Sequence, residues 1–253
     1  ADGLDIVKTI EEEKGAVIGI SAKTKKNITE LKELIGQFAN NEQGEERRIV
    51  ADLIEPSDFV VLVVPIDKAA PKGRLILPQQ QTIRDILEAD AVSIVVKEYE
   101  LAKTLESLGK KPKLVITDSQ AFAQVAKDTP DDIMLTSFSI LFARYKGDLK
   151  EVVKGVVALE NLKDGDKILI AEGCTHHRQC DDIGTVKLPR WIKEHVKKQV
   201  EFEFCSGGEF PYDLSKYKLI VHCGGCMLND KEMKHRIACA KNKNIPITNY
   251  GIL

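Results

Sequence analysis

The chain lacks the features that would place it in a membrane, in a secretory pathway or on nucleic acid. None of its apolar runs approaches the ~18 residues that a transmembrane helix needs, and no basic segment followed by an apolar secretory stretch begins it. Its 37 Lys and Arg nearly balance its 39 Asp and Glu, which leaves no broad basic footprint for phosphate backbones. We therefore expect a cytoplasmic, globular protein with no membrane and no nucleic-acid partner.

Cysteine is also scarce. Six Cys in 253 residues are too few for a disulfide framework in a chain of this size, and they are more consistent with metal or redox chemistry. The length, together with 43% hydrophobic residues, allows complete cores and favours about two domains.

The nucleotide-binding motifs of GTPases are missing as well, although the first segment has a GTPase-like end. Residues 16–23 are predicted to form a short strand with a polar turn, and residues 27–38 an amphipathic helix. Because one strand and one helix cannot enclose a core, we interpret residues 1–42 as the remnant of a domain whose beginning is absent. The string Ile20-Ser21-Ala22-Lys23 and the helix after it resemble the last guanine-contacting loop and final helix of Ras-like GTPases.

This resemblance implies that Ser21, Ala22 and Lys23 contact the nucleotide in a parent GTPase. The chain carries neither G-x-x-x-x-G-K-[ST], which would hold the phosphates, nor Asn-Lys-x-Asp, which would hold the base. GTP binding is therefore expected only together with the missing part of the GTPase domain, and the chain as given should not hydrolyse GTP.

The middle segment, residues 43–132, is predicted to be a small α/β domain. A polar linker is predicted over residues 40–48, around the start of this segment. Continuous β-branched runs at 59–66, 91–96 and 113–117 are each followed by helical sequence, which is typical of a parallel sheet covered on both faces. A sheet of only three or four strands leaves hydrogen-bonding edges, so we expect a homodimer that covers an edge.

A second α/β pattern fills residues 133–253. Its strands are predicted at 167–170, 200–204, 218–221 and 245–248, and helices are predicted at 189–199 and 230–241. The fold class is therefore α/β, with two small parallel-sheet domains preceded by the strand–helix remnant of a Ras-like GTPase domain.

Three cysteines follow strands of the last domain. Cys174 comes shortly after the strand at 167–170, while Cys223 directly follows the strand at 218–221 and Cys226 lies three residues later. Loops at the carboxyl ends of parallel strands converge, so we expect the three thiols at one edge of the sheet. Two glycines between Cys223 and Cys226 let the backbone wrap closely around a bound metal centre.

The residues alone leave the kind of metal centre open. A structural zinc site with three cysteines and one histidine, His176 or His222, is one interpretation. A redox C-x-x-C is another, although that motif needs no distant cysteine. A single C-x-x-C joined by one distant cysteine is also a common arrangement for an iron–sulfur cluster held by three thiolates.

The pattern C-x-H, about 45 residues, then H-C-x-x-C resembles the cluster-binding signature of the FeFe-hydrogenase maturation GTPase family HydF. Residues 70–79 resemble the dimerisation segment of that family, and residues 16–38 resemble the end of its GTPase domain. The resemblance implies a scaffold without catalytic activity of its own, which holds a 4Fe-4S cluster on Cys174, Cys223 and Cys226. It also implies a diiron precursor, carried transiently to the apo FeFe-hydrogenase, and radical-SAM maturation enzymes as further partners.

A cubane bound by only three thiolates leaves one iron with an exchangeable ligand, which we expect to be the functional position. The candidates for that ligand are Asp181, Asp182, His222 and His176. A carboxylate or His222 ranks above His176 in this prediction, because hard oxygen or neutral imidazole exchanges more readily than thiolate. The alternatives are an iron–sulfur or thiol oxidoreductase, and a zinc-stabilised regulatory module of a GTPase.

Overall fold

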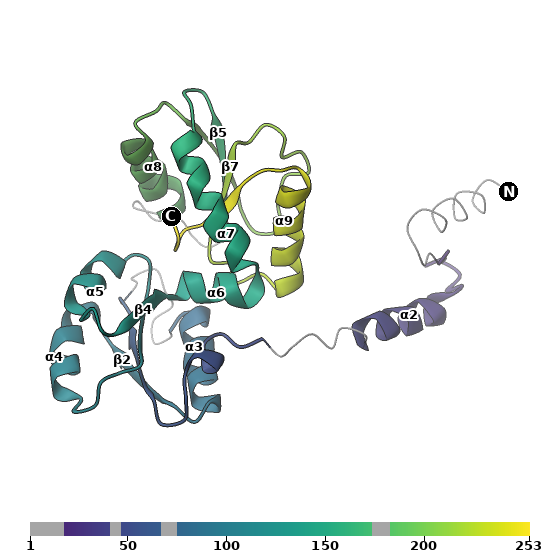
Figure 1. Cartoon of the computed structure of the whole chain (residues 1–253). Coiled ribbons are helices and arrows are strands. Elements are labelled where there is room, and N and C mark those ends of the chain that lie inside the picture. Colours follow the sequence, from purple (N-terminus) through teal and green to yellow (C-terminus); the bar gives the residue numbers. More distant parts are fainter. Residues whose placement is uncertain (1–17, 41–46, 67–74, 174–182) are drawn as a thin grey trace. The chain divides into compact units, whose positions relative to one another are not determined.

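The computed structural model describes residues 18–40, 47–66, 75–173 and 183–253 (Figure 1). The chain divides into two units, Ala1–Arg47 and Arg48–Leu253. None of the helices in the described ranges combines the length and the apolar character that a membrane crossing requires.

In the first unit the predicted helix is confirmed as α2 (Ile28–Asn40). The predicted strand is wrong for its described part, residues 18–23, where only an isolated bridge joins Ser21 to Lys26. Local side-chain hydrogen bonds form a turn instead: the Thr24 amide donates to Ser21 Oγ at 3.2 Å, and Asn27 Nδ2 donates to the Gly19 carbonyl at 2.9 Å. Such short-range bonds compete with strand pairing. The nucleotide-contacting role of Ser21, Ala22 and Lys23 stays a prediction.

The second unit begins with a four-stranded parallel sheet in the order β2-β1-β3-β4. Its strands are β1 (Phe59–Val63), β2 (Val92–Val96), β3 (Leu114–Thr117) and β4 (Met134–Ser137). The helices around it are η1 (Ala51–Leu53), α3 (Leu77–Glu88), η2 (Glu98–Glu100), α4 (Leu101–Ser107), α5 (Phe122–Asp128) and α6 (Phe138–Lys146).

Both faces of this sheet are buried, which explains its continuous β-branched runs. Val60 and Leu62 of β1 belong to a core formed with α3 and α6, while Val61 and Val63 point to the other face and pack with α4 and α5. Strand residues alternate between faces, so covering the two faces requires an apolar residue at every position. The predicted parallel sheet is confirmed.

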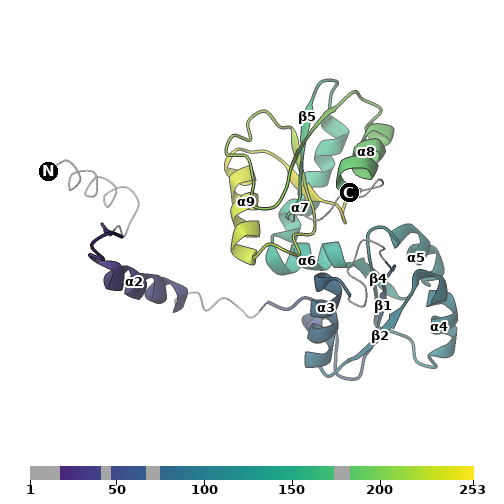
Figure 2. The same cartoon turned by 180° about the vertical axis from the view of Figure 1, so that it is seen from behind.

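The second parallel sheet has the order β6-β5-β7-β8. Its strands are β5 (Lys167–Ala171), β6 (Glu201–Cys205), β7 (Leu219–His222) and β8 (Ile247–Asn249). Figures 1 and 2 show α9 (Asp230–Asn242) on one face, and α7 (Leu149–Val156) with α8 (Leu188–Val196) on the other, in agreement with the two cores of this sheet. A 3-10 turn η3 (Val157–Asn161) follows α7, and a π-helical turn η4 (Ile183–Lys187) precedes α8.

The two helices predicted in this domain are confirmed, but the first ends early. It was expected to reach residue 199, whereas α8 ends at Val196 because Lys197 takes a left-handed conformation with φ +53°. A residue with positive φ stops a right-handed helix.

The domain boundary predicted between residues 132 and 133 does not match the sheets. Strand β4 pairs in parallel with β3, and Phe138 and Phe142 of the following helix α6 pack into the core of the first sheet. The first domain therefore continues to the end of α6, and the second begins with α7.

The two sheets share one topology, because each places its second strand on one side of the first strand and its remaining strands on the other. The strand order thus reverses between β1 and β3 and again between β5 and β7. Ligands of open α/β sheets bind beyond the carboxyl ends of the strands at such a reversal. The crevice beyond β5 and β7 is therefore the first place to look for a site.

Candidate metal centre

Cys223 and Cys226 lie on the turn that joins β7 to α9, directly at this reversal. We call residues 223–229 the cysteine turn. The Cys223 amide donates to the Ala171 carbonyl at 2.9 Å, so pairing with β5 continues one residue past β7. Asn229 ends the turn by capping α9, since its side-chain oxygen accepts from the Glu232 amide at 2.8 Å. The turn is thus fixed at both ends.

Two backbone amides point at the sulfur of Cys223. The Gly173 amide lies 3.0 Å from Cys223 Sγ and the Gly225 amide 3.4 Å. Burial raises the pKa of the Cys223 thiol to about 11, and these two amides oppose the rise. Amides directed at a sulfur stabilise its anionic form, as they do around cluster-bound thiolates. The environment of Cys223 therefore suits a thiolate whose proton a metal displaces.

Glycine is required at two positions of this crevice. Gly225 has φ +65°, and a Cβ there would lie 2.6 Å from Met233 Sδ. A Cβ on Gly173 would lie 2.8 Å from Leu228 Cγ. Both distances are shorter than contacts between heavy atoms allow, so a side chain at either position would force its neighbour to shift. Close wrapping of this backbone around a metal centre stays a prediction.

Helix α6 holds the cysteine turn from the other domain. Lys146, its last residue, donates to the carbonyls of Gly225 at 3.2 Å, Cys226 at 2.8 Å and Leu228 at 2.7 Å. Cys226 itself packs against the core of the first sheet. Burial lowers the pKa of the Lys146 ammonium, while the neighbouring Cys226, Asp230 and Cys223 act in the opposite direction. The turn is therefore a contact between the two sheet domains.

His222 uses both of its ring nitrogens inside the protein. It is 1% exposed; Nδ1 lies 2.8 Å from the Cys223 carbonyl, and Nε2 lies 3.1 Å from Nη1 of Arg236. A carbonyl only accepts and a guanidinium only donates, so the ring is neutral with its proton on Nδ1. Burial lowers the pKa of His222 to about 4, which agrees with this form. The ranking of His222 as fourth ligand is therefore not supported, because neither nitrogen is free to bind a metal.

Arg236 of α9 fixes that orientation of His222. Its side chain is fully buried, donates from Nε to Glu232 at 2.7 Å and from Nη2 to the Gly207 carbonyl at 2.7 Å, and lies 5.0 Å from the Phe210 ring centroid. Sequence reasoning missed both Arg236 and Lys146. No sequence signal separates them from the exposed charges of their helices.

A buried carboxylate was also missed. Glu172 directly follows β5, is 3% exposed, and accepts from the Tyr250 hydroxyl at 3.4 Å. It stands two residues before Cys174. A polar residue immediately after a parallel strand is a signal that could have singled it out.

The other predicted ligands, Cys174, His176, Asp181 and Asp182, lie outside the described residues. Within the described ranges, no group of three or more His, Cys, Asp and Glu side chains lies close enough together to hold a metal ion. The two described thiols, Cys223 and Cys226, thus form only part of the predicted ligand set.

The remaining described cysteines, Cys205 and Cys239, are half-buried in the second domain. Cys205 ends β6 and Cys239 lies on α9, and both pack against the same apolar core. Burial raises the pKa of Cys205 to about 11.

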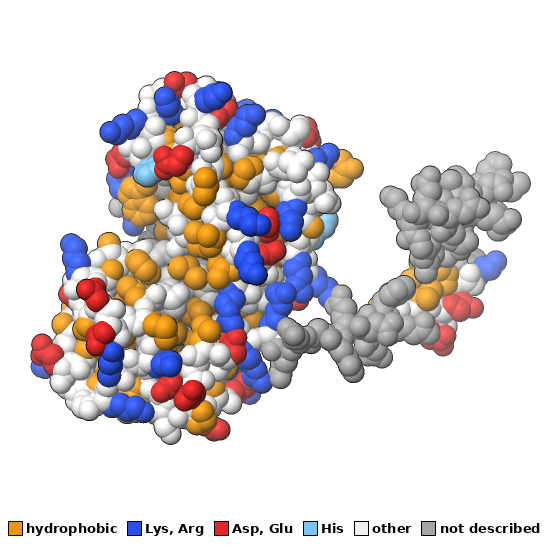
Figure 3. All heavy atoms as spheres, in the orientation of Figure 1, with side chains coloured by type: hydrophobic (Ala, Val, Ile, Leu, Met, Phe, Trp, Pro, Cys, Tyr) orange, Lys and Arg blue, Asp and Glu red, His pale blue; other side chains and the backbone are white. Residues whose placement is uncertain are grey.

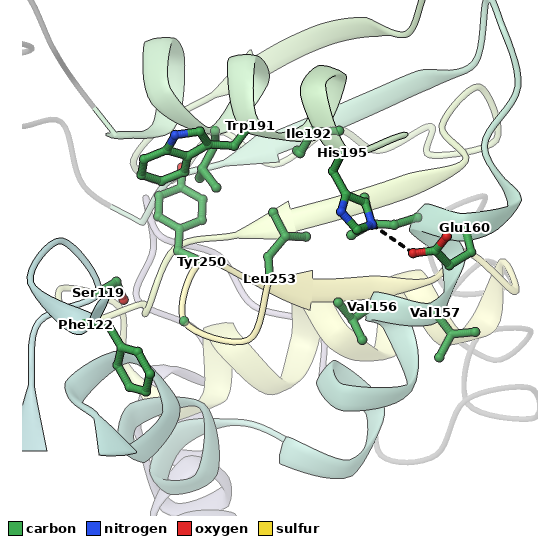
Figure 4. Close-up of a pocket in the computed structure, with 13 residues that line it drawn as sticks. Ser119, Phe122, Val156, Val157, Glu160, Trp191, Ile192, His195, Tyr250 and Leu253 are labelled. Atoms are coloured by element: carbon green, nitrogen blue, oxygen red, sulfur yellow. Dashed lines mark hydrogen bonds and ion pairs between the residues drawn. The ribbon is translucent and has the colours of Figure 1, made fainter. Parts of the chain in front are cut away.

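A separate cavity of about 660 Å³ lies beside α8. Figure 4 shows Trp191 and His195 of α8 facing it together with Tyr250, and His195 Nε2 lies 2.8 Å from Glu160 Oε1. Its walls, as far as the described residues form them, contain no cysteine. This cavity is distinct from the cysteine turn.

Comparison with known proteins gives a family for this chain. No curated protein matches the sequence. Among solved structures, the crystal structure of an NtrC family transcriptional regulator from Clostridium acetobutylicum shares 11% identity over 77% of this chain and 87% of that one, with a TM-score of 0.24. So low a score carries no argument about fold or function.

Two family models divide the chain where the sheets do. Residues 49–147 match the hydrogen maturase F dimerization domain, and residues 150–253 match the hydrogen maturase F tetramerization domain. The family resemblance seen in the sequence motifs is confirmed. Because these two models together account for most of the sequence, the chain belongs to the hydrogen maturase F family and has a role in hydrogenase maturation.

Proposed function

We propose that this chain is a scaffold that binds a 4Fe-4S cluster through Cys174, Cys223 and Cys226 and delivers a diiron precursor to apo FeFe-hydrogenase. One observation carries the proposal: the Gly173 amide touches Cys223 Sγ at 3.0 Å. Cys174 is the next residue, and neighbouring Cα atoms are only about 3.8 Å apart. The described chain thus approaches Cys223 at the residue before Cys174, which supports Cys174 as the third ligand in this proposal.

The donor set also fits such a cluster. Cys223 and Cys226 are spaced as in cluster-binding C-x-x-C motifs, and two amides point at the Cys223 sulfur. Once bound on three thiolates, the cluster would supply one iron whose fourth ligand can be replaced. An exchangeable position suits a carrier better than an electron-transfer centre, for which four thiolates would serve.

With both nitrogens of His222 engaged, we assign the exchangeable ligand to Asp181, Asp182 or His176. The test is electron paramagnetic resonance of the reduced cluster with added imidazole, in alanine variants of these three residues. Replacing the true ligand changes the spectrum before imidazole is added. If all three variants have the wild-type spectrum and the wild-type response, none of them is the ligand.

Cluster binding itself is tested by anaerobic reconstitution followed by iron, sulfide and zinc analysis. Serine variants of Cys174, Cys223 and Cys226 should each lose most of the cluster, while the control Cys239→Ser should keep it, because Cys239 packs into the second core. Zinc in place of iron in the wild-type protein would favour a structural zinc module. Full iron content in Cys174→Ser would refute the three-cysteine site.

Self-association is part of the proposal, and the dimerization and tetramerization domains that the chain matches support it. Strand β2 is an edge of the first sheet, and its Val92 and Val95 are exposed. A second copy paired along β2 would complete the hydrogen bonding of this edge. In the second domain, Val157 and Trp191 are exposed, and Figure 3 shows hydrophobic side chains among the charged ones on one face of this unit.

A further inference from the structure

The ammonium group of Lys146 is fully used by the cysteine turn. Its three N–H donors meet three carbonyl oxygens, those of Gly225, Cys226 and Leu228, at 2.7–3.2 Å. The residue is 8% exposed, and its Nζ lies 5.3 Å from the Phe142 ring centroid. Lys146 is therefore a buried cation that donates hydrogen bonds to one turn of backbone.

No carboxylate of the described residues forms an ion pair with Lys146. Asp230, the acidic residue at the start of α9, is bound to Lys234 instead, at 3.3 Å. A buried charge is costly unless an opposite charge or several dipoles compensate it. Here three carbonyl dipoles and the face of the Phe142 ring contact the ammonium, and Asp230 acts on it from a longer distance. The thiols of Cys223 and Cys226 are neighbouring groups that can become anionic.

We infer that Lys146 is a positioning residue of the cluster site, which shapes the cysteine turn and provides the positive charge that faces an anionic cluster. This inference rests on the proposed function. Three thiolates outweigh the positive charge of a cubane core, and reduction adds a further negative charge. Net charge and hydrogen bonding set the potentials of such clusters, so a fixed cation beside the turn favours the reduced state.

With Lys146 in this role, the dimerization domain is part of the cluster site. Lys146 ends α6, which belongs to residues 49–147, whereas the cysteine turn belongs to residues 150–253. The start of the same helix also meets the turn, since a Cβ on Gly224 would lie 3.5 Å from Ser139 Cα. Helix α6 thus lies along the turn from Ser139 to Lys146.

The test compares Lys146→Gln, which keeps hydrogen-bond donors but removes the charge, with Lys146→Arg, which keeps both. The control is Lys154→Met, whose side chain on α7 is 72% exposed. The readouts are thermal unfolding of the metal-free protein, iron content, and the midpoint potential of the reconstituted cluster. We expect Lys146→Gln to disfavour reduction about tenfold, which is about 59 mV for a one-electron couple, and Lys146→Arg to restore most of the loss.

The outcomes separate the role of Lys146 from cluster binding by the chain. A folded Lys146→Gln protein that no longer holds iron supports the positioning role. A wild-type potential in Lys146→Gln refutes the inference but leaves the cluster scaffold intact, whereas a wild-type protein that binds no cluster refutes both. Unfolding of metal-free Lys146→Gln would also overturn the inference, because it would assign Lys146 to the fold and not to the cluster.

Discussion

Replacing Arg236 by Met should destabilise the second domain strongly, although Arg236 lies in a helix rich in exposed charges. The guanidinium is fully buried and donates to His222 Nε2, the Gly207 carbonyl and Glu232. Its loss leaves His222 Nε2 buried without a donor, at about 1–3 kcal/mol, and removes the donor of the half-buried Gly207 carbonyl. Glu232 is 34% exposed and regains water. We therefore expect a loss of about 3–5 kcal/mol in the free energy of unfolding, the range for breaking a buried charged network.

Urea unfolding followed by the fluorescence of the single tryptophan, Trp191 on α8, measures this loss in the second domain. The matched control is Arg190→Met on α8, because Arg190 is 59% exposed and its guanidinium lies 3.9 Å from the Glu194 carboxylate. Such a pair contributes about 0–1 kcal/mol. The midpoint should fall for Arg236→Met with little change in slope. A loss no larger than that of Arg190→Met would show that the Arg236 network does not hold the domain together.

Further predictions concern the turn, the surface and the edge strand. Gly225→Ala should lower the free energy of unfolding by about 1–2 kcal/mol, because its backbone is left-handed, and contact with Met233 should add to this loss. Gly224→Ala should cost clearly less, and equal melting temperatures of the two variants would contradict this. Hydrogen bonds from Lys216 and others lower the pKa of Glu203 from 4.5 to about 2. The stability that Glu203 contributes is therefore present above pH 4.5 and is lost as the pH falls towards 2. Glu203→Gln should therefore weaken the dependence of the free energy of unfolding on pH in that window. Val95→Lys on β2 should weaken self-association in sedimentation experiments without lowering the melting temperature, and an unchanged sedimentation profile would exclude this edge.

The fold was predictable where burial leaves a pattern in the sequence. The strand β1 could be found because both of its faces are covered, so its run of valines and leucine has no polar interruption. Strand β4 gave no such signal, since it is an edge strand whose Met134 is exposed. For this reason the domain boundary was placed before β4, whereas the sheet continues through it.

The site was predictable only as far as topology determines it. Cys223 could be placed at the carboxyl end of the sheet because it directly follows a recognisable strand. The engagement of His222 by Arg236, and that of the cysteine turn by Lys146, depend on side chains that only tertiary packing brings together. Spacing along the chain says nothing of which charged residue of a helix is buried, so these partners could not be predicted.

X-ray absorption at the iron edge of the anaerobically reconstituted chain, measured alongside Cys174→Ser, tests the central claim most directly. We predict sulfur ligands, the short iron–iron distance of a cubane, and a light-atom ligand at one iron that imidazole replaces; in Cys174→Ser the iron–iron distance should be largely lost. An unaltered iron–iron distance in Cys174→Ser, or a wild-type centre without a light-atom ligand, would contradict a cluster held by Cys174, Cys223 and Cys226 with one open position.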